Sequence, residues 1–424
     1  MDTYLQILYK ELRPAMGCTE PAASALAGAK AAELLGSEPT ELQVVTSRDM
    51  VKNAMGVGLP NCTLKGIQAA VALGAFGGDS ERGLSILSAL TSDQIQKASS
   101  VRVSLSIDDH VPPLYIQVVA KSDDKKAVAV ISGEHDRFSY LEQDGKILRS
   151  LAVDTCGTEL EKEDELFLDH VSVEELLGYV EHAPQEALDM VLDAKRTNMA
   201  IALYALEHDY GLNVGKTAAE SLHNPPLTLA EAFSLGSALA AAASDARMAG
   251  CPLPVIINSG SGNQGITITV PIAVVGEYLK SSEEKLAKAL LIAQLVGLAL
   301  TARKNRLSAL CGAFTAAIGT ACGFVYLLDG TLEQMDGAFN TMVGNLTGII
   351  CDGAKMTCAL KIYSCVEAAA LASKLAVKNL SPDSESGIVG RSSSESMDFL
   401  KRISHEGMEQ TDKTILSIML GKQL

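Results

Sequence analysis

The apolar residues of this 424-residue chain change their spacing part-way along it, and this change constrains the fold more than any other feature. Residues 101–107 and 115–120 alternate apolar and polar side chains, a pattern typical of strands that bury one face. The Asp144-Gly145 pair that follows is a signal for a hairpin turn. From Ser172 onward almost every segment has the spacing of a helix. The sequence therefore predicts an α+β protein in which a smaller α/β module is inserted into a large, mostly helical domain.

The breaks between these patterns divide the chain into three predicted regions. Residues 1–38 are predicted to form N-terminal helices that pack on the catalytic domain, and residues 39–171 to form the mixed α/β module. Residues 172–424 are predicted to form the helical catalytic domain, which a Gly-rich stretch at 258–265 and a polar loop at 381–396 interrupt. Aromatic residues make up only 4% of the chain while Ala and Gly are abundant, so we expect helices that approach one another closely.

The formal net charge of −16 argues against a surface for nucleic acid or anionic membranes, because such surfaces need clustered Lys and Arg. We therefore expect a small-molecule substrate and no nucleic-acid or membrane partner. The uncharged stretch 307–328 has the length of a membrane span, but its Ser, Thr and Gly residues favour a buried pair of helices. Residues 1–10 look like the polar start of a helix rather than a secretory signal, so a cytoplasmic protein with reduced cysteines is expected. A homo-oligomer is expected as well.

Nine cysteines are present, and five of them have apolar or unremarkable neighbours that predict ordinary packing: Cys62, Cys156, Cys251, Cys322 and Cys365. Three others have more distinctive surroundings. Cys311 follows a charged segment, and Cys351 and Cys358 enclose a short stretch in which Gly353 permits a tight turn. Thiolates are the preferred ligands of iron–sulfur clusters, but this spacing matches neither a ferredoxin run nor a paired zinc motif. From the residues alone, cluster ligands and buried core thiols both remain open.

Cys18 has the most suggestive local context, because it lies between Pro14 and Pro21 at the start of a predicted helix. The N-terminus of a helix lowers the pKa of a thiol, so we expect a reactive thiol, with a loop-anchoring residue as the alternative. Glu20 beside it is either a general acid or base, or an acid that favours the helix dipole. His110, His135 and His170 lie in polar segments and are predicted to be at the surface.

Several motifs occur together in a fixed order, namely 13–21 (RPAMGCTEP), 52–60 (KNAMGVGLP), 258–265 (NSGSGNQG), 311–313 (CGA), 351–355 (CDGAK) and 407–412 (GMEQTD). With these motifs the chain resembles the L-cysteine desulfidase family, which is related to the α-chain of the iron–sulfur L-serine dehydratases. The resemblance covers nearly the whole chain.

The resemblance implies an oxygen-sensitive 4Fe-4S cluster, no pyridoxal phosphate (PLP), and β-elimination of L-cysteine to pyruvate, ammonia and sulfide. By position, Cys311, Cys351 and Cys358 match the cluster ligands, although Cys351 and Cys358 lie closer together than in the dehydratases. An open iron would then act as a Lewis acid in place of the PLP electron sink. L-Serine dehydratase activity at the same site, and a non-catalytic metal-binding protein, are the alternative functions.

The remaining site residues are assigned around this cluster. Five residues of the Gly-rich stretch are expected to form a cradle for the substrate carboxylate, with Asn61 in a second loop over the substrate: Ser259, Gly260, Ser261, Gly262 and Asn263. Cys18 is expected to be the general base, with Lys304 or Lys355 as helpers, or else a displaceable fourth ligand of the cluster.

Overall fold

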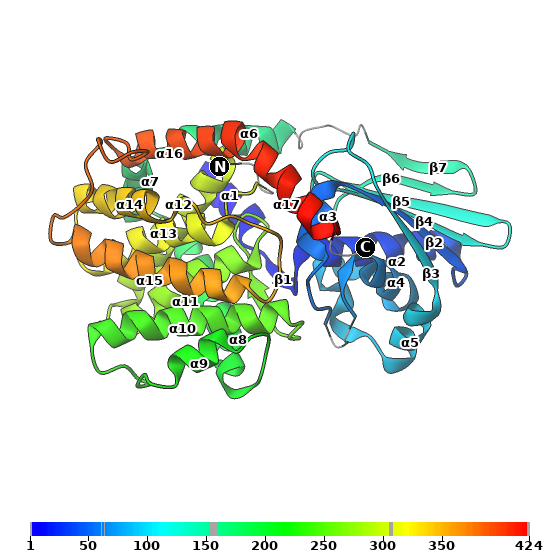
Figure 1. The fold of residues 1–424 in the computed structure, drawn as a ribbon, viewed down its shortest axis with the longest axis horizontal. Coiled ribbons are helices and arrows are strands. Elements are labelled where there is room, and N and C mark those ends of the chain that lie inside the picture. The colour runs from blue at the N-terminus through cyan, green and yellow to red at the C-terminus, as the bar shows by residue number, and fades with distance from the viewer. Residues whose placement is uncertain (1, 61, 63, 152–158, 305–307, 422–424) are drawn as a thin grey trace.

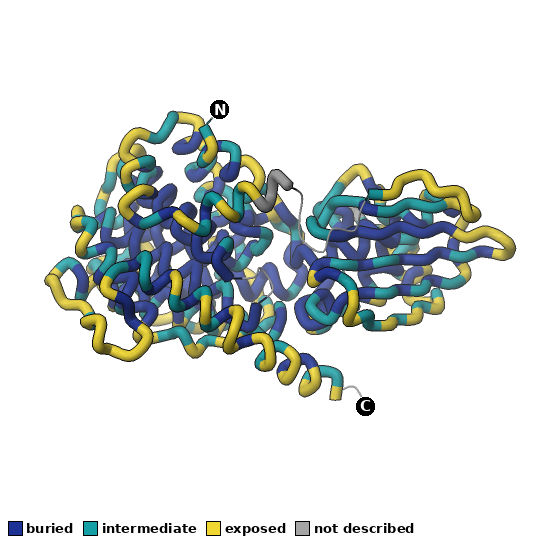
Figure 2. The backbone as a smooth tube through the Cα atoms, turned by 90° about the horizontal axis from the view of Figure 1, so that it is seen from above, coloured by how far each residue is buried: buried dark blue, intermediate teal, exposed yellow. Residues whose placement is uncertain are grey.

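A computed structural model describes residues 2–421 except 61, 63, 152–158 and 305–307. A helical body and a smaller body built on a sheet lie side by side along the long axis of the molecule (Figure 1). Each has its own zone of buried backbone (Figure 2). The predicted α+β class is therefore confirmed.

The smaller body contains a six-stranded sheet with the order β3-β2-β4-β5-β6-β7. Its strands are β2 (Glu41–Thr46), β3 (Arg102–Ile107), β4 (Tyr115–Ser122), β5 (Lys125–Ser132), β6 (Phe138–Gln143) and β7 (Lys146–Ser150). Only β2 and β3 run parallel; all other neighbours in this sheet are antiparallel. Asp144 and Gly145 both have positive φ between β6 and β7, so the predicted hairpin is confirmed.

Helices α2 (Thr19–Leu35) and α4 (Gly66–Gly77) pack against each other, and α2 also lies on β4 and β5. The smaller body is completed by α3 (Arg48–Ala54), the 3₁₀ segment η1 (Ser80–Ala89) and α5 (Ser92–Ser100). The helix pair approaches closely because each helix presents a glycine to the backbone of the other. A Cβ atom on Gly74 would lie 1.9 Å from the carbonyl oxygen of Ala25, and one on Gly28 would lie 2.3 Å from that of Val71.

The helical body is built around long, buried helices, as the small-residue composition predicts. Its elements are α1 (Thr3–Glu11), α6 (Glu159–His170), α7 (Val173–Glu181), α8 (Gln185–Glu207), α9 (Val214–Ala219), α10 (Leu229–Met248), α11 (Gly262–Tyr278), α12 (Glu283–Arg303), α13 (Gly312–Leu327), α14 (Leu332–Leu346), α15 (Cys358–Ala376), α16 (Ser393–Arg402), the π-helix η2 (Ile403–Gly407) and α17 (Glu409–Gly421). The stretch predicted as a buried pair of helices contains one helix, α13, instead of two; the predicted burial is confirmed, because almost all its side chains are buried.

Among the described residues, α12 alone is long and apolar enough to cross a membrane, and 83% of its apolar window is buried inside the protein. It packs closely against α13 and also contacts α11 and α8, which accounts for its apolar surface. Three of the cysteines predicted to be packing residues, Cys251, Cys322 and Cys365, are buried. Cys62 is only partly buried, and Cys156 lies outside the described residues.

The chain passes between the two bodies near its N-terminus. Helix α1 contributes Leu5, Ile7 and Leu8 to the helical core, whereas α2 belongs to the core of the sheet body. Between them, β1 (Pro14–Met16) pairs antiparallel with β8 (Pro254–Ile256), the strand that leads into α11. Cys18 therefore lies where the chain leaves one body and enters the other.

The glycine contact between α2 and α4 can be tested by adding one methyl group. Gly74→Ala forces two backbones apart, and we expect a loss of about 1–3 kcal/mol in unfolding free energy, as for other overpacked cores. Gly178→Ala in α7 is the matched control, since a Cβ there meets nothing within 4 Å and should stabilise the helix by about 0.5–1 kcal/mol. Chemical denaturation of both variants measures the difference. Equal stabilities would contradict the close packing.

Candidate active site

A cavity of about 750 Å³ lies between the two bodies and is lined by residues of both. Nine of the residues assigned to the site from the sequence line it, from four separate segments of the chain: Cys18, Ser259, Gly260, Ser261, Asn263, Lys304, Cys311, Cys351 and Cys358. Gly262 and Lys355 are not among its described lining residues, and Asn61 lies outside the described part of the chain.

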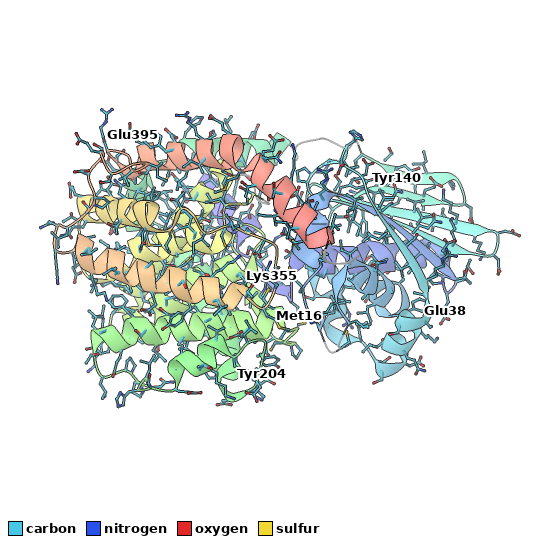
Figure 3. The ribbon with its side chains drawn as sticks, viewed as in Figure 1. Met16, Glu38, Tyr140, Tyr204, Lys355 and Glu395 are labelled. Atoms are coloured by element: carbon cyan, nitrogen blue, oxygen red, sulfur yellow. The ribbon has the colours of Figure 1, made fainter. Side chains whose placement is uncertain are left out.

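Lys355 is oriented by its own loop. Its ammonium forms an ion pair with Asp352 at 2.6 Å, and its Cβ packs beside Gly56 of the sheet body. It lies just before α15 at the side of the helical body that faces the sheet (Figure 3). The role of Lys355 as a helper in proton transfer stays a prediction.

Two of the three distinctive cysteines lie on backbone segments that pair with each other. Cys311 is the N-cap of α13 and Cys351 lies in the loop between α14 and α15. The N–H of Cys311 donates to the carbonyl of Ile349 at 3.1 Å, and the N–H of Cys351 donates to that of Ala309 at 2.6 Å. This pairing holds the two thiols in hydrogen-bond contact. Cys358 begins α15, and its thiol donates to the carbonyl of Gly353 at 3.8 Å.

The pair of thiols is electrically asymmetric. The hydrogen bond from Cys311 lowers the pKa of Cys351, and the nearby Lys52 and the backbone N–H of Gly353 lower it further against the effect of burial. The same hydrogen bond and burial raise the pKa of Cys311 well above its usual range. Burial also raises the pKa of Cys358. The pair therefore favours a thiolate at Cys351 and a proton on Cys311.

Lys52 is the buried cation of this region, with its side chain only 2% exposed. Its Nζ lies 2.5 Å from Oδ1 of Asp412 and 3.7 Å from Oδ1 of Asp49. Burial opposes its charge, but Cys351 and Asp412 outweigh burial and raise the pKa of Lys52. Lys52 was not singled out from the sequence, although it begins one of the motifs that carry the resemblance.

Gly353 brings the cysteine loop against Lys52. It has φ +90°, and a Cβ atom there would lie 1.9 Å from the carbonyl oxygen of Lys52. Asp412 of α17 completes the contact, because its other oxygen accepts the N–H of Ala309 at 2.8 Å. One carboxylate thus joins the sheet body to the segment that carries Cys311.

The donors present suit an iron–sulfur cluster in their chemistry. Three thiols line one cavity, and Lys52 and Lys361 are close enough to Cys351 to act on it electrostatically, as an anionic cluster requires. Within the described ranges, however, no group of three or more His, Cys, Asp or Glu side chains is gathered around one point as a metal site. The three thiols are the kind of ligand that an iron–sulfur cluster needs, and the two lysines supply the positive charge that offsets an anionic cluster.

Cys18 is the N-cap of α2, as predicted, but its side chain is not the activated thiolate that a helix N-terminus implies. Its Sγ donates to Oε2 of Glu20 at 2.9 Å. Burial, followed by the negative charge of Glu20, raises the pKa of Cys18 well above the usual value, while Arg247 acts in the opposite direction. The expected lowering of this pKa is therefore wrong, because desolvation exceeds the effect of the helix dipole.

Glu20 is held as a carboxylate at the same place. Burial alone would raise its pKa, but His135, Cys18 and the local backbone together lower that pKa to about 2. Asn53 donates to its Oε1 at 3.0 Å and Thr19 donates to its Oε2 at 3.1 Å. The surface position predicted for His135 is wrong: its side chain is only 12% exposed and its Nε2 lies 4.0 Å from Glu20. His110 and His170 are exposed, as predicted.

The Gly-rich stretch forms a tight turn into α11. Ser259 and Gly260 have positive φ, and the hydroxyl of Ser261 caps the helix by accepting the N–H of Gln264 at 3.4 Å. Asn258, buried behind the turn, donates to the side chain of Gln294 at 2.8 Å. The turn therefore presents polar groups to the cavity on a buried, hydrogen-bonded support.

Gly262 and Asn263 both face Arg247, a residue that the sequence analysis missed. A Cβ atom on Gly262 would lie 2.4 Å from Nε of Arg247, so this glycine makes room for the guanidinium. Asn263 accepts a hydrogen bond from Nη1 of Arg247 at 3.1 Å. The feature of the sequence that could have identified Arg247 is that it is a single Arg in an Ala-rich, apolar helix.

Comparison with known proteins identifies the family to which this chain belongs. A family model described as serine dehydratase alpha chain matches residues 81–417. A UPF0597 protein of Oleidesulfovibrio alaskensis is 41% identical over 99% of this chain and 98% of its own length. UPF0597 proteins of Phocaeicola vulgatus and Clostridioides difficile are 37% and 38% identical to this chain, and the similarity covers 98% of the length of each. The chain belongs to the serine dehydratase alpha-chain family.

Family membership confirms the predicted relation to the serine dehydratase α-chain. It identifies a lyase of the serine-dehydratase type, whereas the names of the UPF0597 relatives describe no activity. The matched segment contains the Gly-rich turn, Arg247 and all three distinctive cysteines. Cys18, Glu20 and Lys52 lie before the segment but are covered by the full-length relatives.

Replacing the carboxylate that joins the two bodies should weaken the fold. Asp412→Asn leaves the buried ammonium of Lys52 without its closest partner, and we expect a loss of about 2–3 kcal/mol in unfolding free energy. Glu38→Gln, which breaks an exposed pair with Lys97, is the control and should cost less than about 0.5 kcal/mol. Urea titration compares the two. Similar losses would contradict the assigned role of Asp412.

Proposed function

We propose that this protein is an iron–sulfur lyase that performs β-elimination on L-cysteine, forming pyruvate, ammonia and sulfide without PLP. The observation that carries the proposal is one cavity that combines three thiols, a buried Lys52 and a Cys18–Glu20 pair. Membership in the serine dehydratase alpha-chain family, which is generally linked to iron–sulfur clusters, supports it. Elimination of water from L-serine at the same site is the second candidate, favoured by the name of the family.

Cys311, Cys351 and Cys358 would hold the cluster in this proposal. When bound, a cluster with three protein ligands supplies an open iron that acts as a Lewis acid. Positively charged side chains near the three cysteines would offset the negative charge of the cluster. Lys52 stabilises the thiolate form of Cys351, and Asp412 fixes the position of Lys52. Helix α15 adds Lys361, which pairs with Asp352 and whose ammonium also donates to the carbonyl of Ile350 at 2.8 Å.

Cys18 is proposed to remove the Cα proton, and Lys304 is the second candidate within the cavity. The Cα proton of an amino acid is weakly acidic, so an efficient base must itself have a high affinity for protons. Burial and Glu20 give the Cys18 thiolate this property. Cys18 must lose its Sγ proton before it can act as a base, so the fraction of protein molecules that are active depends on pH.

The turn at 259–263 is proposed to bind the substrate carboxylate. Ser261 and Asn263 place side-chain donors at the cavity, the hydroxyl of Ser259 donates to Oδ1 of Asn258, and Gly260 allows the backbone to approach. The support behind the turn keeps these donors fixed. A pre-oriented cradle of this kind excludes water from the reacting end of the substrate and limits its freedom.

The cluster and the reaction can be tested together on protein isolated without oxygen. We expect iron, acid-labile sulfide, and pyruvate formation that is faster with L-cysteine than with L-serine. Cys351→Ser should lose most of the iron, because it replaces the proposed thiolate ligand. Cys322→Ala is the matched control, since Cys322 is buried in α13 away from the cavity. Iron absent from the anaerobic protein would overturn the cluster, and a large preference for L-serine would select the second candidate.

The dependence on pH provides a separate test of the base. Because the pKa of Cys18 is raised, kcat should increase with pH beyond the range of an ordinary thiol. Glu20→Gln removes a negative charge that raises this pKa, so the rising limb should move to lower pH. Cys18→Ala should lower kcat by about 10²–10⁴-fold. A profile of kcat that does not move in the Glu20 variant would contradict the role of Cys18.

A further inference from the structure

Arg247 is a buried charge that lacks the partner such a residue normally has. It lies in the last turn of α10, lines the cavity, and is 3% exposed. Its Nη1 donates to Asn263, while its Nε has no hydrogen-bond partner. In the part of the chain that the structure describes, no carboxylate forms an ion pair with it. A buried guanidinium is costly unless an anion accompanies it, so this arrangement favours an anionic ligand.

The surroundings of Arg247 support the same conclusion. Gly262, the first residue of α11, lets the guanidinium lie against the N-terminus of that helix. The 17-residue helix α11 therefore directs its positive end to the same part of the cavity. Two positive charges placed together without a protein anion form a site for a carboxylate.

Glu20 provides the opposite charge in the same cavity. It is 7% exposed and remains ionised; among the described residues neither Lys nor Arg forms an ion pair with it, and Nε2 of His135 lies 4.0 Å from its Oε1. Its Oε2 accepts hydrogen bonds from Cys18 and Thr19, whereas Oε1 accepts one from Asn53. A carboxylate oxygen has two acceptor positions, so Oε1 can accept a further donor such as an ammonium group.

The two charges act on one thiol and form no ion pair with each other. Thr19 connects their surroundings, because its hydroxyl contacts both Oε2 of Glu20 and the carbonyl of Gly260 at 3.1 Å. Cys18 lies within the electrostatic reach of both Glu20 and Arg247. A ligand that carries a carboxylate and an ammonium on adjacent atoms would satisfy both groups at once.

We propose that Arg247 and Glu20 bind the α-carboxylate and the α-ammonium of a free amino acid; this assignment deepens, and rests on, the proposed lyase function. The carboxylate carbon and the ammonium nitrogen are both bonded to Cα. Anchoring both groups in the cavity that Cys18 and the three cysteines also line would hold Cα within the same cavity as the thiol proposed to act as the base. The site therefore selects free amino acids over peptides, amides and N-acyl derivatives.

Binding of L-alanine tests this assignment, because L-alanine has both charged groups but no leaving group. Calorimetric titration of the anaerobically isolated protein should show binding of L-alanine. L-Alaninamide, which lacks the carboxylate charge, and N-acetyl-L-alanine, which lacks the ammonium, should each bind about 10–100-fold more weakly. Failure of L-alanine to bind the wild-type protein, or equal affinity for all three compounds, would overturn the proposal.

Pairing each variant with each ligand identifies which residue binds which group. Arg247→Met should weaken binding of L-alanine about 10–100-fold while leaving L-alaninamide nearly unchanged, and Arg247→Lys should recover part of the loss. Glu20→Gln should weaken L-alanine by a similar factor while leaving N-acetyl-L-alanine nearly unchanged. Arg196→Met, at an exposed position outside the cavity, is the control and should bind as the wild type does. An identical loss for all ligands in either variant would overturn the assignment.

This experiment separates the two proposals. Correct ligand pairing in a protein that forms no pyruvate from cysteine or serine would refute the lyase function while retaining the amino-acid site. Pyruvate formation with no dependence of L-alanine binding on Arg247 or Glu20 would refute the site while retaining the lyase. Circular dichroism of each variant distinguishes lost binding from lost fold, and Arg247→Lys keeps the charge where Arg247→Met unfolds.

Discussion

The ion pair between Lys52 and Asp412 holds together segments that are hundreds of residues apart in the sequence. Lys52 belongs to the sheet body, Asp412 to the last helix, and Asp412 also binds the backbone next to Cys311. Gly353 then allows the loop of Cys351 to lie on the backbone of Lys52. In Figure 1, α17 runs from the helical body onto the sheet body beside α3, which carries Lys52. The arrangement of the thiols depends on this pair, because it sets both their position and their charge.

Three buried charges of the cavity, those of Lys52, Arg247 and Glu20, form no ion pair with one another. Lys52 faces the cysteines, Arg247 faces the turn at 259–263, and Glu20 faces Cys18. Each charge is buried, and burial of unlike charges that do not pair with each other reduces stability. Such an arrangement persists where a ligand completes it, since binding then recovers the lost interaction. The same burial gives Cys18 its high proton affinity, so binding and proton transfer depend on one low-dielectric environment.

Local patterns in the sequence were sufficient for most of the fold. Alternation predicted β3 and β4, and Asp144-Gly145 predicted the hairpin between β6 and β7, because both signals act between neighbouring residues. The common site of Cys18, Cys311 and the Gly-rich turn followed from an ordered set of motifs. Periodicity could not have supplied it, because these segments meet only through tertiary packing.

The errors have one physical origin. The pKa of Cys18 and the burial of His135 were judged from adjacent residues, but both depend on burial between the two bodies. Arg247 was overlooked because its role depends on Gly262 and Asn263. These two residues begin the next helix, so no pattern of neighbouring residues links them to Arg247. Long-range desolvation and pairing are not encoded in local patterns.

The position of the cavity between two separate hydrophobic cores determines how this protein loses activity. Each core can remain folded while the contacts between them open, because the bridging contacts described here are few compared with those inside either core. Mild denaturant or heat should therefore separate Cys18 and Glu20 from the three thiols before either body unfolds. Activity should then be lost before the secondary structure of either body.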